Sequence, residues 1–333
     1  MELNHSPKCA VIGYGSWATA IVKILTENGI KVNWHILNEE ILSSVKSEGR
    51  NCKYLRDVDL DNSLINASHD INEVVRDTQN VVLAMPSAFM KDVMKPLIEP
   101  LHDKLVISAV KGIIPEQYIT ITEYIAQQYA VDEDHMALIT GPSHAEEVGM
   151  GRLSYLTAVC KNKQAQQQVI DMFSRPYIRV STSEDVEGVE YGAIMKNIYA
   201  IAVGMASGLG YGDNFIAVLI ANCAAEMNRF FEACSGGKHN TFASACLGDL
   251  LVTCYSTYSR NRRFGLLIGR GCTVRSAMNE MTMVAEGYFA TKCIRHTKAR
   301  QEAEMPIADM VYEVLYNGAS ARRTMTALTK KLI

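Results

Sequence analysis

A strand, a glycine-rich turn and a helix follow one another at the start of the chain, and this order constrains the fold more than any other feature. Residues 8–12 form an apolar run that predicts a buried strand, and residues 19–29 (TAIVKILTENG) have helical spacing with a glycine at the end. Residues 13–18 (GYGSWA) lie between them and match a GxGxxA pattern. Strand, glycine turn and helix in this order are typical of a dinucleotide-binding site.

Each small residue of the pattern has a predicted task. Gly13 would make the tight turn, Gly15 would let a pyrophosphate approach the backbone, and Ala18 would fit the helix against the strand. The helix N-terminus, which includes Ser16 and Trp17, would supply free N–H groups to the phosphates. A tight strand-to-helix turn without a ligand also requires glycines, so the pattern by itself leaves that alternative open.

The alternation of strand and helix continues through the first half of the chain. Further buried strands are predicted at residues 31–36, 80–84, 104–109, 136–140, 156–160 and 177–180, with helical segments at 70–77 and 87–98. No strand is predicted after residue 183, where the sequence becomes helical. We therefore predict an α/β protein with a Rossmann-like dinucleotide-binding domain at residues 1–185 and an all-helical substrate and catalytic domain at 186–333.

The residues after the second predicted strand bear on the choice between NAD and NADP. An acidic residue there binds the ribose of NAD, whereas a basic residue accommodates the 2′-phosphate of NADP. This chain has Leu37, which can do neither, followed by Asn38, Glu39 and Glu40. Because the two glutamates can equally begin the next helix, the sequence leaves the preference open.

Residues 191–212 form a long apolar helical run in which Lys196 is the one formal charge. Desolvation penalises an ammonium group, so a buried lysine without a close carboxylate has a lowered pKa and can exchange a proton near neutral pH. The alternative is that its stem packs while the ammonium reaches water. A membrane span is a further alternative, but Lys196, Asn197 and the five glycines of the run argue against it.

Four other polar segments are candidate ligand contacts, and each has a structural alternative. Lys111 follows a predicted strand, where lysines are often only solvated. Residues 141–147 (GPSHAEE) could face an anion or simply cap a helix. Asp249 lies in an apolar helix and needs a partner if it is buried. Residues 259–263 (SRNRR) suit a phosphate, because arginine binds it in a bidentate manner, but they could also form a solvated turn.

Composition excludes several classes of protein. The net charge of −3 and the pI near 6.3 give no reason to expect binding to nucleic acid or anionic lipid. The nine cysteines are scattered without a CxxC pair, which favours a reducing cytosol, and we expect no signal peptide and no stable membrane insertion. HExxH and GxSxG are absent, so neither a metal site nor a serine hydrolase is expected.

Taken together, these segments resemble the bacterial NAD(P)-dependent glycerol-3-phosphate dehydrogenase family. The resemblance covers nearly the whole chain. It rests on GYGSWATA (13–20), KGI (111–113), GPSHAEE (141–147), VEYGAIMKNIYAIAVGMASGLGYGDN (189–214), LGDLLVTC (247–254), SRNRRFG (259–265), AEGY (285–288) and MPI (305–307). Eight matches in the same order are far more specific than any one of them.

The resemblance implies an enzyme that interconverts sn-glycerol 3-phosphate and dihydroxyacetone phosphate and supplies glycerol 3-phosphate for phospholipid synthesis. Lys196 would be the proton acceptor, assisted by Lys111 and Asp249. The substrate contacts implied are Lys111, Gly141, Ser143, Lys196, Asp249, Ser259, Arg260 and Asn261. The NAD or NADP contacts implied are Gly13, Gly15, Ser16, Trp17, Lys111, Ala145, Arg260, Val284 and Glu286.

Some positions depart from the family pattern. Leu37 replaces a basic residue that many members have, His144 replaces an aromatic residue, and residues 221–223 (ANC) replace Thr-Arg-Gly. Two rival functions remain: a related dehydrogenase of 3-hydroxy acids, and a dinucleotide-binding sensor without catalysis. The family also implies a cytoplasmic location and, because the helical domains of such enzymes often pair, a homodimer.

Overall fold

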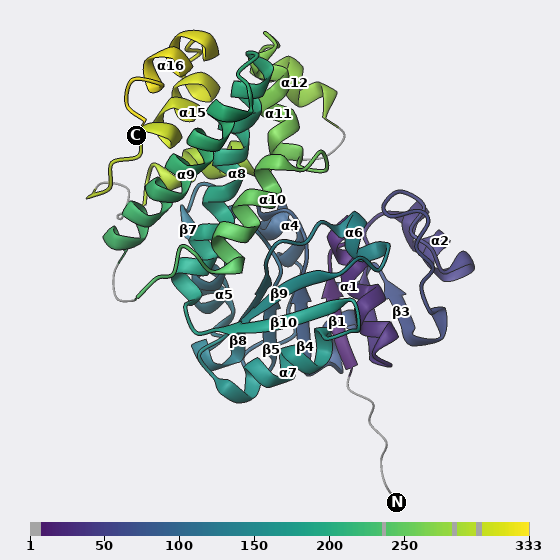
Figure 1. Cartoon of the computed structure of the whole chain (residues 1–333). Coiled ribbons are helices and arrows are strands. Elements are labelled where there is room, and N and C mark those ends of the chain that lie inside the picture. Colours follow the sequence, from purple (N-terminus) through teal and green to yellow (C-terminus); the bar gives the residue numbers. More distant parts are fainter. Residues whose placement is uncertain (1–7, 235–237, 282–284, 298–301, 333) are drawn as a thin grey trace, which may run out of the picture. The chain divides into compact units, whose positions relative to one another are not determined.

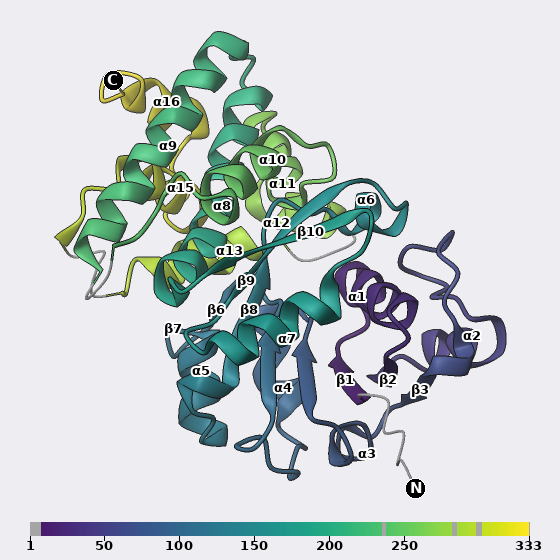
Figure 2. The same cartoon turned by 60° about the horizontal axis from the view of Figure 1, so that its bottom comes forward.

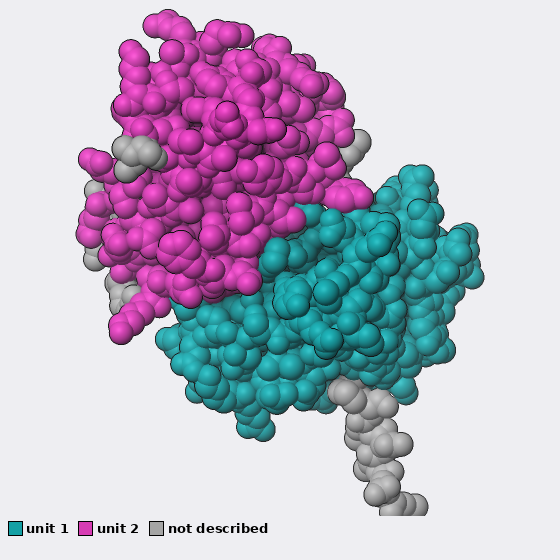
Figure 3. Space-filling view, viewed as in Figure 1, with its two compact units in different colours: residues 1–110, 121–186 teal, residues 111–120, 187–333 magenta. Residues whose placement is uncertain are grey.

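The computed structural model describes residues 8–234, 238–281, 285–297 and 302–332. The described chain forms two compact units (Figure 3): unit 1 contains residues up to Val110 together with 121–186, and unit 2 contains 111–120 together with the residues from Glu187 onward. These units follow backbone contacts, whereas the functional division at residues 185 and 186 stays a prediction.

Unit 1 is built on a single eight-stranded sheet with the order β10-β9-β8-β5-β4-β1-β2-β3 (Figure 1). Its strands are β1 (Lys8–Ile12), β2 (Lys31–His35), β3 (Ile65–Ser68), β4 (Asn80–Leu83), β5 (Leu105–Ser108), β8 (Met136–Thr140), β9 (Ser154–Val159) and β10 (Ile178–Ser183). Neighbouring strands are parallel except for β8 and β9, which are antiparallel. The expected Rossmann-like fold is confirmed.

The helices of unit 1 are α1 (Ser16–Glu27), α2 (Glu39–Glu48), α3 (Ile71–Arg76), α4 (Met90–Met94), α5 (Ile121–Tyr129), α6 (Ala145–Gly149) and α7 (Lys163–Phe173), with short 3₁₀ turns at Asn62–Leu64, Ser87–Phe89 and Glu133–His135. Helices α1 and α7 contact one another on one face of the sheet (Figure 2). The helix expected at residues 87–98 is shorter than predicted, because it divides into a 3₁₀ turn and the five residues of α4.

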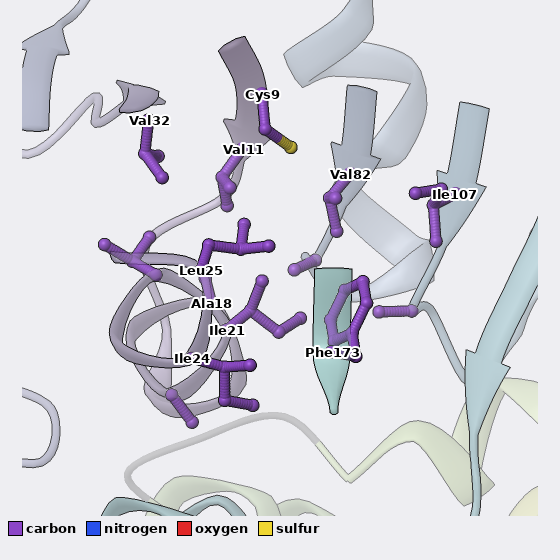
Figure 4. Close-up of a cluster of buried hydrophobic side chains, with 14 of the residues drawn as sticks. Cys9, Val11, Ala18, Ile21, Ile24, Leu25, Val32, Val82, Ile107 and Phe173 are labelled. Carbon is purple, nitrogen blue, oxygen red and sulfur yellow. The ribbon is translucent and has the colours of Figure 1, made fainter. Parts of the chain in front are cut away.

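The core of unit 1 lies between α1 and the sheet (Figure 4). Ala18, Ile21 and Leu25 on α1 are buried together with Val11 and Val82 on the neighbouring strands β1 and β4. Spacings of three and four residues bring these three side chains to one face of the helix. The burial of this face holds the N-terminal end of α1 beside the glycine turn.

In its described residues, unit 2 is helical apart from loops and a small hairpin formed by β6 (Ile113–Ile114) and β7 (Ile119–Thr120). Its helices are α8 (Val186–Gly208), α9 (Asp213–Ala233), α10 (Asp249–Tyr255), α11 (Arg260–Gly269), α12 (Val274–Glu280), α13 (Glu286–Ile294), α15 (Pro306–Tyr316) and α16 (Ala321–Leu328), and a π-helical turn, Ser244–Gly248, precedes α10. The expectation of a helical C-terminal part is confirmed within the described residues.

Helix α8 is buried along most of its length, which explains why its sequence is apolar on every side. It is an interior helix of unit 2. None of the helices in the described part of the chain combines the length and the apolar character required to cross a bilayer.

Candidate active site

Two lysines and one aspartate meet in the interior of unit 2. The Nζ atom of Lys196 forms an ion pair with Oδ1 of Asp249, and the Nζ atom of Lys111 lies 3.1 Å from Oδ2 of the same carboxylate. Lys196 and Asp249 are only 5% and 1% exposed, whereas Lys111 is partly exposed. One buried carboxylate therefore contacts two ammonium groups. A buried aspartate needs a charged partner, and Asp249 has two.

Three separate elements position these side chains. Lys196 lies in the middle of α8, Asp249 is the first residue of α10, and Lys111 directly precedes the β6–β7 hairpin. Thr253 lies one turn after Asp249 and its hydroxyl donates to the Asp249 carbonyl at 2.5 Å. This bond ties the first turn of α10 together at the residue that bears the carboxylate.

The electrostatics of the site favour proton exchange by Lys196. Burial lowers the pKa of Lys196, Asp249 opposes this shift and Lys111 adds to it, and together they bring the pKa to about 7. Burial alone would raise the pKa of Asp249, but the charges of Lys111 and Lys196 outweigh it, and the pKa is lowered. At neutral pH the site thus contains a carboxylate, a cation and an amine that can either accept or donate a proton.

The sequence predicted a lowered pKa for a buried lysine without a close carboxylate, and that condition is not met. Asp249 contacts Lys196 directly, although the two residues are 53 positions apart. The predicted direction of the pKa shift nevertheless holds, because desolvation is the largest of its causes. The alternative in which the ammonium reaches water is excluded by its burial.

A chain of amide groups connects this site to two further helices. Asn197 donates from Nδ2 to the Lys111 carbonyl at 3.1 Å, and Asn261 donates from Nδ2 to Asn197 Oδ1 at 2.9 Å. The backbone N–H of Gly287 donates to Asn261 Oδ1, also at 2.9 Å. Asn197 thus holds the backbone of Lys111. It was not assigned from the sequence, although its place beside Lys196 in a buried helix was a signal that it has a polar partner.

The other described candidate residues of unit 2 lie within two positions of Asn261 or Gly287 in sequence. Ser259 is the N-cap of α11 and accepts from the Arg262 N–H, so its hydroxyl has the structural role that a turn would give it. Arg260 begins α11 and is exposed, and Glu286 begins α13. Val284 lies outside the described residues.

The glycine turn of unit 1 fits a dinucleotide. Gly13 has a φ of +117°, and a Cβ atom there would lie 2.2 Å from the Ala84 carbonyl, so a side chain is excluded. A Cβ at Gly15 would meet nothing within 4 Å, which leaves open space above the backbone. Gly15 is also the N-cap of α1 and provides no side-chain cap for the N–H groups that begin at Ser16.

Trp17 lies in the first turn of α1 with its indole Nε1 buried and without a hydrogen-bond partner. The remaining candidates of unit 1 lie after β8. Gly141 has a φ of +128°, which favours glycine, and the Ser143 hydroxyl donates back to the Gly141 carbonyl at 3.1 Å. Ala145 is the first residue of α6, whose N-cap is His144 without a side-chain cap bond. Ser143 therefore does not cap this helix.

The residues after β2 have structural tasks that the sequence left open. Leu37 is 49% exposed, and Asn38 is the N-cap of α2, where its side chain accepts from the Ile41 N–H. Glu39 and Glu40 form the first turn of this helix. Their charges stabilise the helix N-terminus, and Glu40 also forms an ion pair with Lys53 at 2.6 Å.

Comparison with known proteins identifies close relatives along the whole chain. Residues 8–166 match the family described as NAD-dependent glycerol-3-phosphate dehydrogenase N-terminus, and residues 185–326 match its C-terminus. Glycerol-3-phosphate dehydrogenase [NAD(P)+] of Staphylococcus haemolyticus is 37% identical over 314 residues and covers 93% of each chain. The enzyme of the same name from Moorella thermoacetica is 36% identical over 325 residues, which are 97% of this chain and 95% of that one.

Solved structures agree with these sequence relationships. The crystal structure of glycerol-3-phosphate dehydrogenase from Coxiella burnetii has a TM-score of 0.90 and 29% identity, and the match covers 97% of this chain and 99% of that chain. D-mandelate dehydrogenase is more distant, with a TM-score of 0.59 and 14% identity over 95% of this chain and 99% of that one, and it shares only the fold.

Proposed function

The chain belongs to the NAD-dependent glycerol-3-phosphate dehydrogenase family, and we propose that it interconverts sn-glycerol 3-phosphate and dihydroxyacetone phosphate with Lys196 as the acid/base. Family membership makes it an oxidoreductase that uses NAD or NADP. The observation that carries the assignment of Lys196 is its burial against Asp249 with a pKa of about 7. Such a group changes protonation state where a cellular enzyme operates.

The proposed reaction moves one hydride and one proton. In the oxidation direction the Lys196 amine accepts the proton of the C2 hydroxyl as the C2–H bond breaks and a C2=O bond forms. The bound nicotinamide supplies the hydride acceptor, so NAD(P)+ becomes NAD(P)H. In the reduction direction the Lys196 ammonium donates its proton to the ketone oxygen of dihydroxyacetone phosphate. Asp249 keeps Nζ in place, and Lys111 holds a second positive charge near the oxygen that becomes negative.

The other ligand contacts follow from the family resemblance. Besides Lys111, Lys196 and Asp249, the proposed substrate contacts are Gly141, Ser143, Ser259, Arg260 and Asn261. The proposed dinucleotide contacts are Gly13, Gly15, Ser16, Trp17, Lys111, Ala145, Arg260, Val284 and Glu286. The uncapped N-terminus of α1 and the open space above Gly15 support the dinucleotide assignment. The guanidinium of Arg260, exposed at the start of α11, suits a phosphate.

The proposed physiological role is the supply of glycerol 3-phosphate for phospholipid synthesis in the cytoplasm. The nine cysteines are free thiols, six of them buried, and this supports a reducing compartment. A homodimer is proposed on the family resemblance. The rival 3-hydroxy acid dehydrogenase and the sensor without catalysis are outcomes of the experiment that follows.

The test measures the oxidation of NADH and of NADPH with dihydroxyacetone phosphate and, in parallel, with a 3-keto acid. We expect turnover with the phosphate, and the ratio of the two kcat/KM values would reveal which dinucleotide the residues after β2 select. Replacement of Lys196 by Met should lower kcat by about 100- to 10,000-fold, which is typical for removal of an acid/base group.

Lys104→Met is the matched control, because Lys104 is also buried but donates to the Thr78 carbonyl in unit 1. The kcat of Lys104→Met, expressed per folded molecule, should equal that of the unaltered protein. Turnover with the keto acid alone would favour the rival dehydrogenase, dinucleotide binding without turnover would favour the sensor, and normal turnover by Lys196→Met would refute the acid/base role.

A further inference from the structure

Three successive carbonyl groups of the glycine turn accept hydrogen bonds from three side chains. The Gly13 carbonyl accepts from Trp34 Nε1 at 2.6 Å, and the Tyr14 carbonyl accepts from Asn51 Nδ2 at 3.0 Å. The Gly15 carbonyl accepts from Thr19 Oγ1, also at 3.0 Å, in addition to the helical bond of 2.9 Å from the Thr19 backbone N–H. Every carbonyl from residue 13 to residue 15 is therefore directed toward a side-chain donor.

The three donors are fully buried and come from different parts of unit 1. Trp34 lies on β2, Thr19 lies on α1, and Asn51 follows α2, and each is 0% exposed. Asn51 also donates to Thr19 Oγ1 at 2.9 Å and accepts from the backbone N–H groups of Lys53 and Tyr54 at 3.1 Å. Because both ends of its amide have partners, its orientation is fixed.

The direction of these carbonyls determines what the turn presents to a ligand. In a trans peptide the C=O and the following N–H point in opposite directions, so inward carbonyls at 13–15 turn the N–H groups of Tyr14, Gly15 and Ser16 the other way. Carbonyl oxygens are partially negative and repel a pyrophosphate, whereas N–H groups attract it. A flip of one of these peptide planes would turn its carbonyl toward the ligand and its N–H group away from it.

We propose that Trp34, Asn51 and Thr19 are positioning residues for the dinucleotide pyrophosphate, because they hold the carbonyl groups of residues 13–15 inward and so preset the turn for the anion. The glycine pattern permits this conformation, since Gly13 adopts a φ of +117°. The hydrogen bonds from the three buried donors then favour this conformation over the others that glycine allows. The turn is thereby preorganised, and less of the binding free energy is spent on ordering it.

Packing alone does not account for the polar atoms of these side chains. Trp34 belongs to the hydrophobic core cluster of unit 1, where a phenyl ring would bury a similar apolar surface without the N–H. Valine has nearly the shape of threonine and would equally fill the space at position 19. The hydroxyl and indole N–H groups therefore have a task beyond filling the core.

The test compares two threonines of the same helix. Thr19→Val removes the hydroxyl that bonds to the turn. Thr26→Val removes another buried hydroxyl of α1, which bonds to the Val22 carbonyl at 2.9 Å, also four residues earlier, and to the Lys23 carbonyl at 3.1 Å. Calorimetric titration with NADH should show binding weakened by about threefold to tenfold in Thr19→Val, the effect of one net hydrogen bond, and unchanged binding in Thr26→Val.

Titration with ADP locates the effect. ADP contains the diphosphate without the nicotinamide, so its affinity should fall by the same factor, while kcat at saturating NADH and the KM for dihydroxyacetone phosphate stay as in the unaltered protein. Trp34→Phe keeps the aromatic packing, removes the donor to Gly13 and should weaken both ligands in the same way. This variant tests the idea independently if Thr19→Val folds poorly.

Three outcomes would overturn the proposal. Unchanged NADH affinity in both Thr19→Val and Trp34→Phe would show that the carbonyl bonds do not preset the turn. Equal weakening in Thr26→Val would reduce the effect to a general loss of stability. Weaker NADH binding with normal ADP binding would place the effect away from the pyrophosphate.

Discussion

Lys196 has two charged neighbours that act on the pKa of its ammonium group in opposite directions. Lys111 lowers this pKa by charge repulsion, and Asp249 raises it by attraction, while burial sets the overall shift toward about 7. The two neighbours therefore set the pH at which Lys196 loses its proton and would become available as the proposed base.

The pH dependence of the reaction should report this balance. Oxidation of glycerol 3-phosphate requires the neutral amine, so kcat/KM should rise as the pH increases through about 7, and the rate of reduction, which requires the ammonium, should fall over the same range. Asp249→Asn removes the charge that raises the pKa of Lys196, so the midpoint of the kcat/KM profile should move to lower pH. Lys111→Met removes a charge that lowers this pKa, so the midpoint should move to higher pH. Profiles of kcat/KM for the three proteins provide the measurement.

Both variants will also lower the rate itself, and the loss of rate is not the criterion. The criterion is the direction in which the midpoint moves. Midpoints that move the same way in Asp249→Asn and Lys111→Met, or an unaltered protein whose profile is flat through neutral pH, would contradict the assignment of Lys196 as the titrating group.

Helices α8 and α11 approach so closely that their backbones touch. Hypothetical Cβ atoms at four glycines would lie within 2.4 Å of carbonyl oxygens on the opposite helix: Gly204 and Gly208 on α8, and Gly265 and Gly269 on α11. This contact sets the distance between Asn197 on one helix and Asn261 on the other, which share a hydrogen bond of 2.9 Å. The glycines thus maintain the chain of amides beside Lys111.

Replacement of Gly204 by Ala should separate the two helices. Its Cβ would lie 2.1 Å from the Arg262 carbonyl, and the strain should cost about 1–3 kcal/mol of folding free energy. Thermal unfolding should reveal a lower Tm, and kcat with dihydroxyacetone phosphate should fall. Gly212→Ala is the control, since a Cβ there meets nothing within 4 Å. Because Gly212 is the N-cap of α9, the change should lower the Tm slightly, by less than Gly204→Ala, and leave kcat unchanged. Equal behaviour of the two variants would refute the role of the close contact.

Sequence patterns predicted long elements better than short ones. The strands of the sheet with continuous Val and Ile runs were predicted, but β3 has the sequence INAS with only two apolar residues, and β6 and β7 are two residues each. Such short strands form because neighbouring elements pair with them, and their own residues carry little signal. The glycine spacing of α8 was visible but was used only to argue against a membrane span.

Residue patterns predicted the site only as separate residues, and their grouping was implied by the family resemblance alone. Lys111 and Asp249 are 138 positions apart, so no local pattern connects them, and the fold alone brings the two charges together. The donors Trp34 and Asn51 were missed for the same reason. Their bonds to the glycine turn depend on the strand order of the sheet, which places β2 beside β1.

On the scale of the whole molecule, the chain passes from unit 1 to unit 2 and back before its final crossing. Residues 111–120 leave unit 1 after β5, form the β6–β7 hairpin in unit 2 and return at α5. The hairpin is held in unit 2 by contacts of β6 with α13 and by Tyr118, whose ring stacks on His296 with the centroids 4.3 Å apart. Lys111 therefore belongs structurally with Lys196 and Asp249, although its neighbours in sequence form the dinucleotide-binding sheet.

Amide hydrogen exchange with two successive ligands should show whether residues 111–120 respond together with unit 2. NAD+ alone should slow exchange at residues 13–19 in unit 1, and any protection that it brings near Lys111, a proposed dinucleotide contact, should be shared with α11 and α13 of unit 2 and not with β5. Dihydroxyacetone phosphate added with NAD+ forms no product, because both are oxidised, and it should slow exchange in α8, α10 and the hairpin together. Tyr118→Ala should weaken the attachment of the hairpin and reduce its protection, while residues 13–19 respond to NAD+ as before. If the hairpin instead became protected with NAD+ alone, in step with β5, residues 111–120 would act as part of unit 1, and the placement of Lys111 by the C-terminal helices would be refuted.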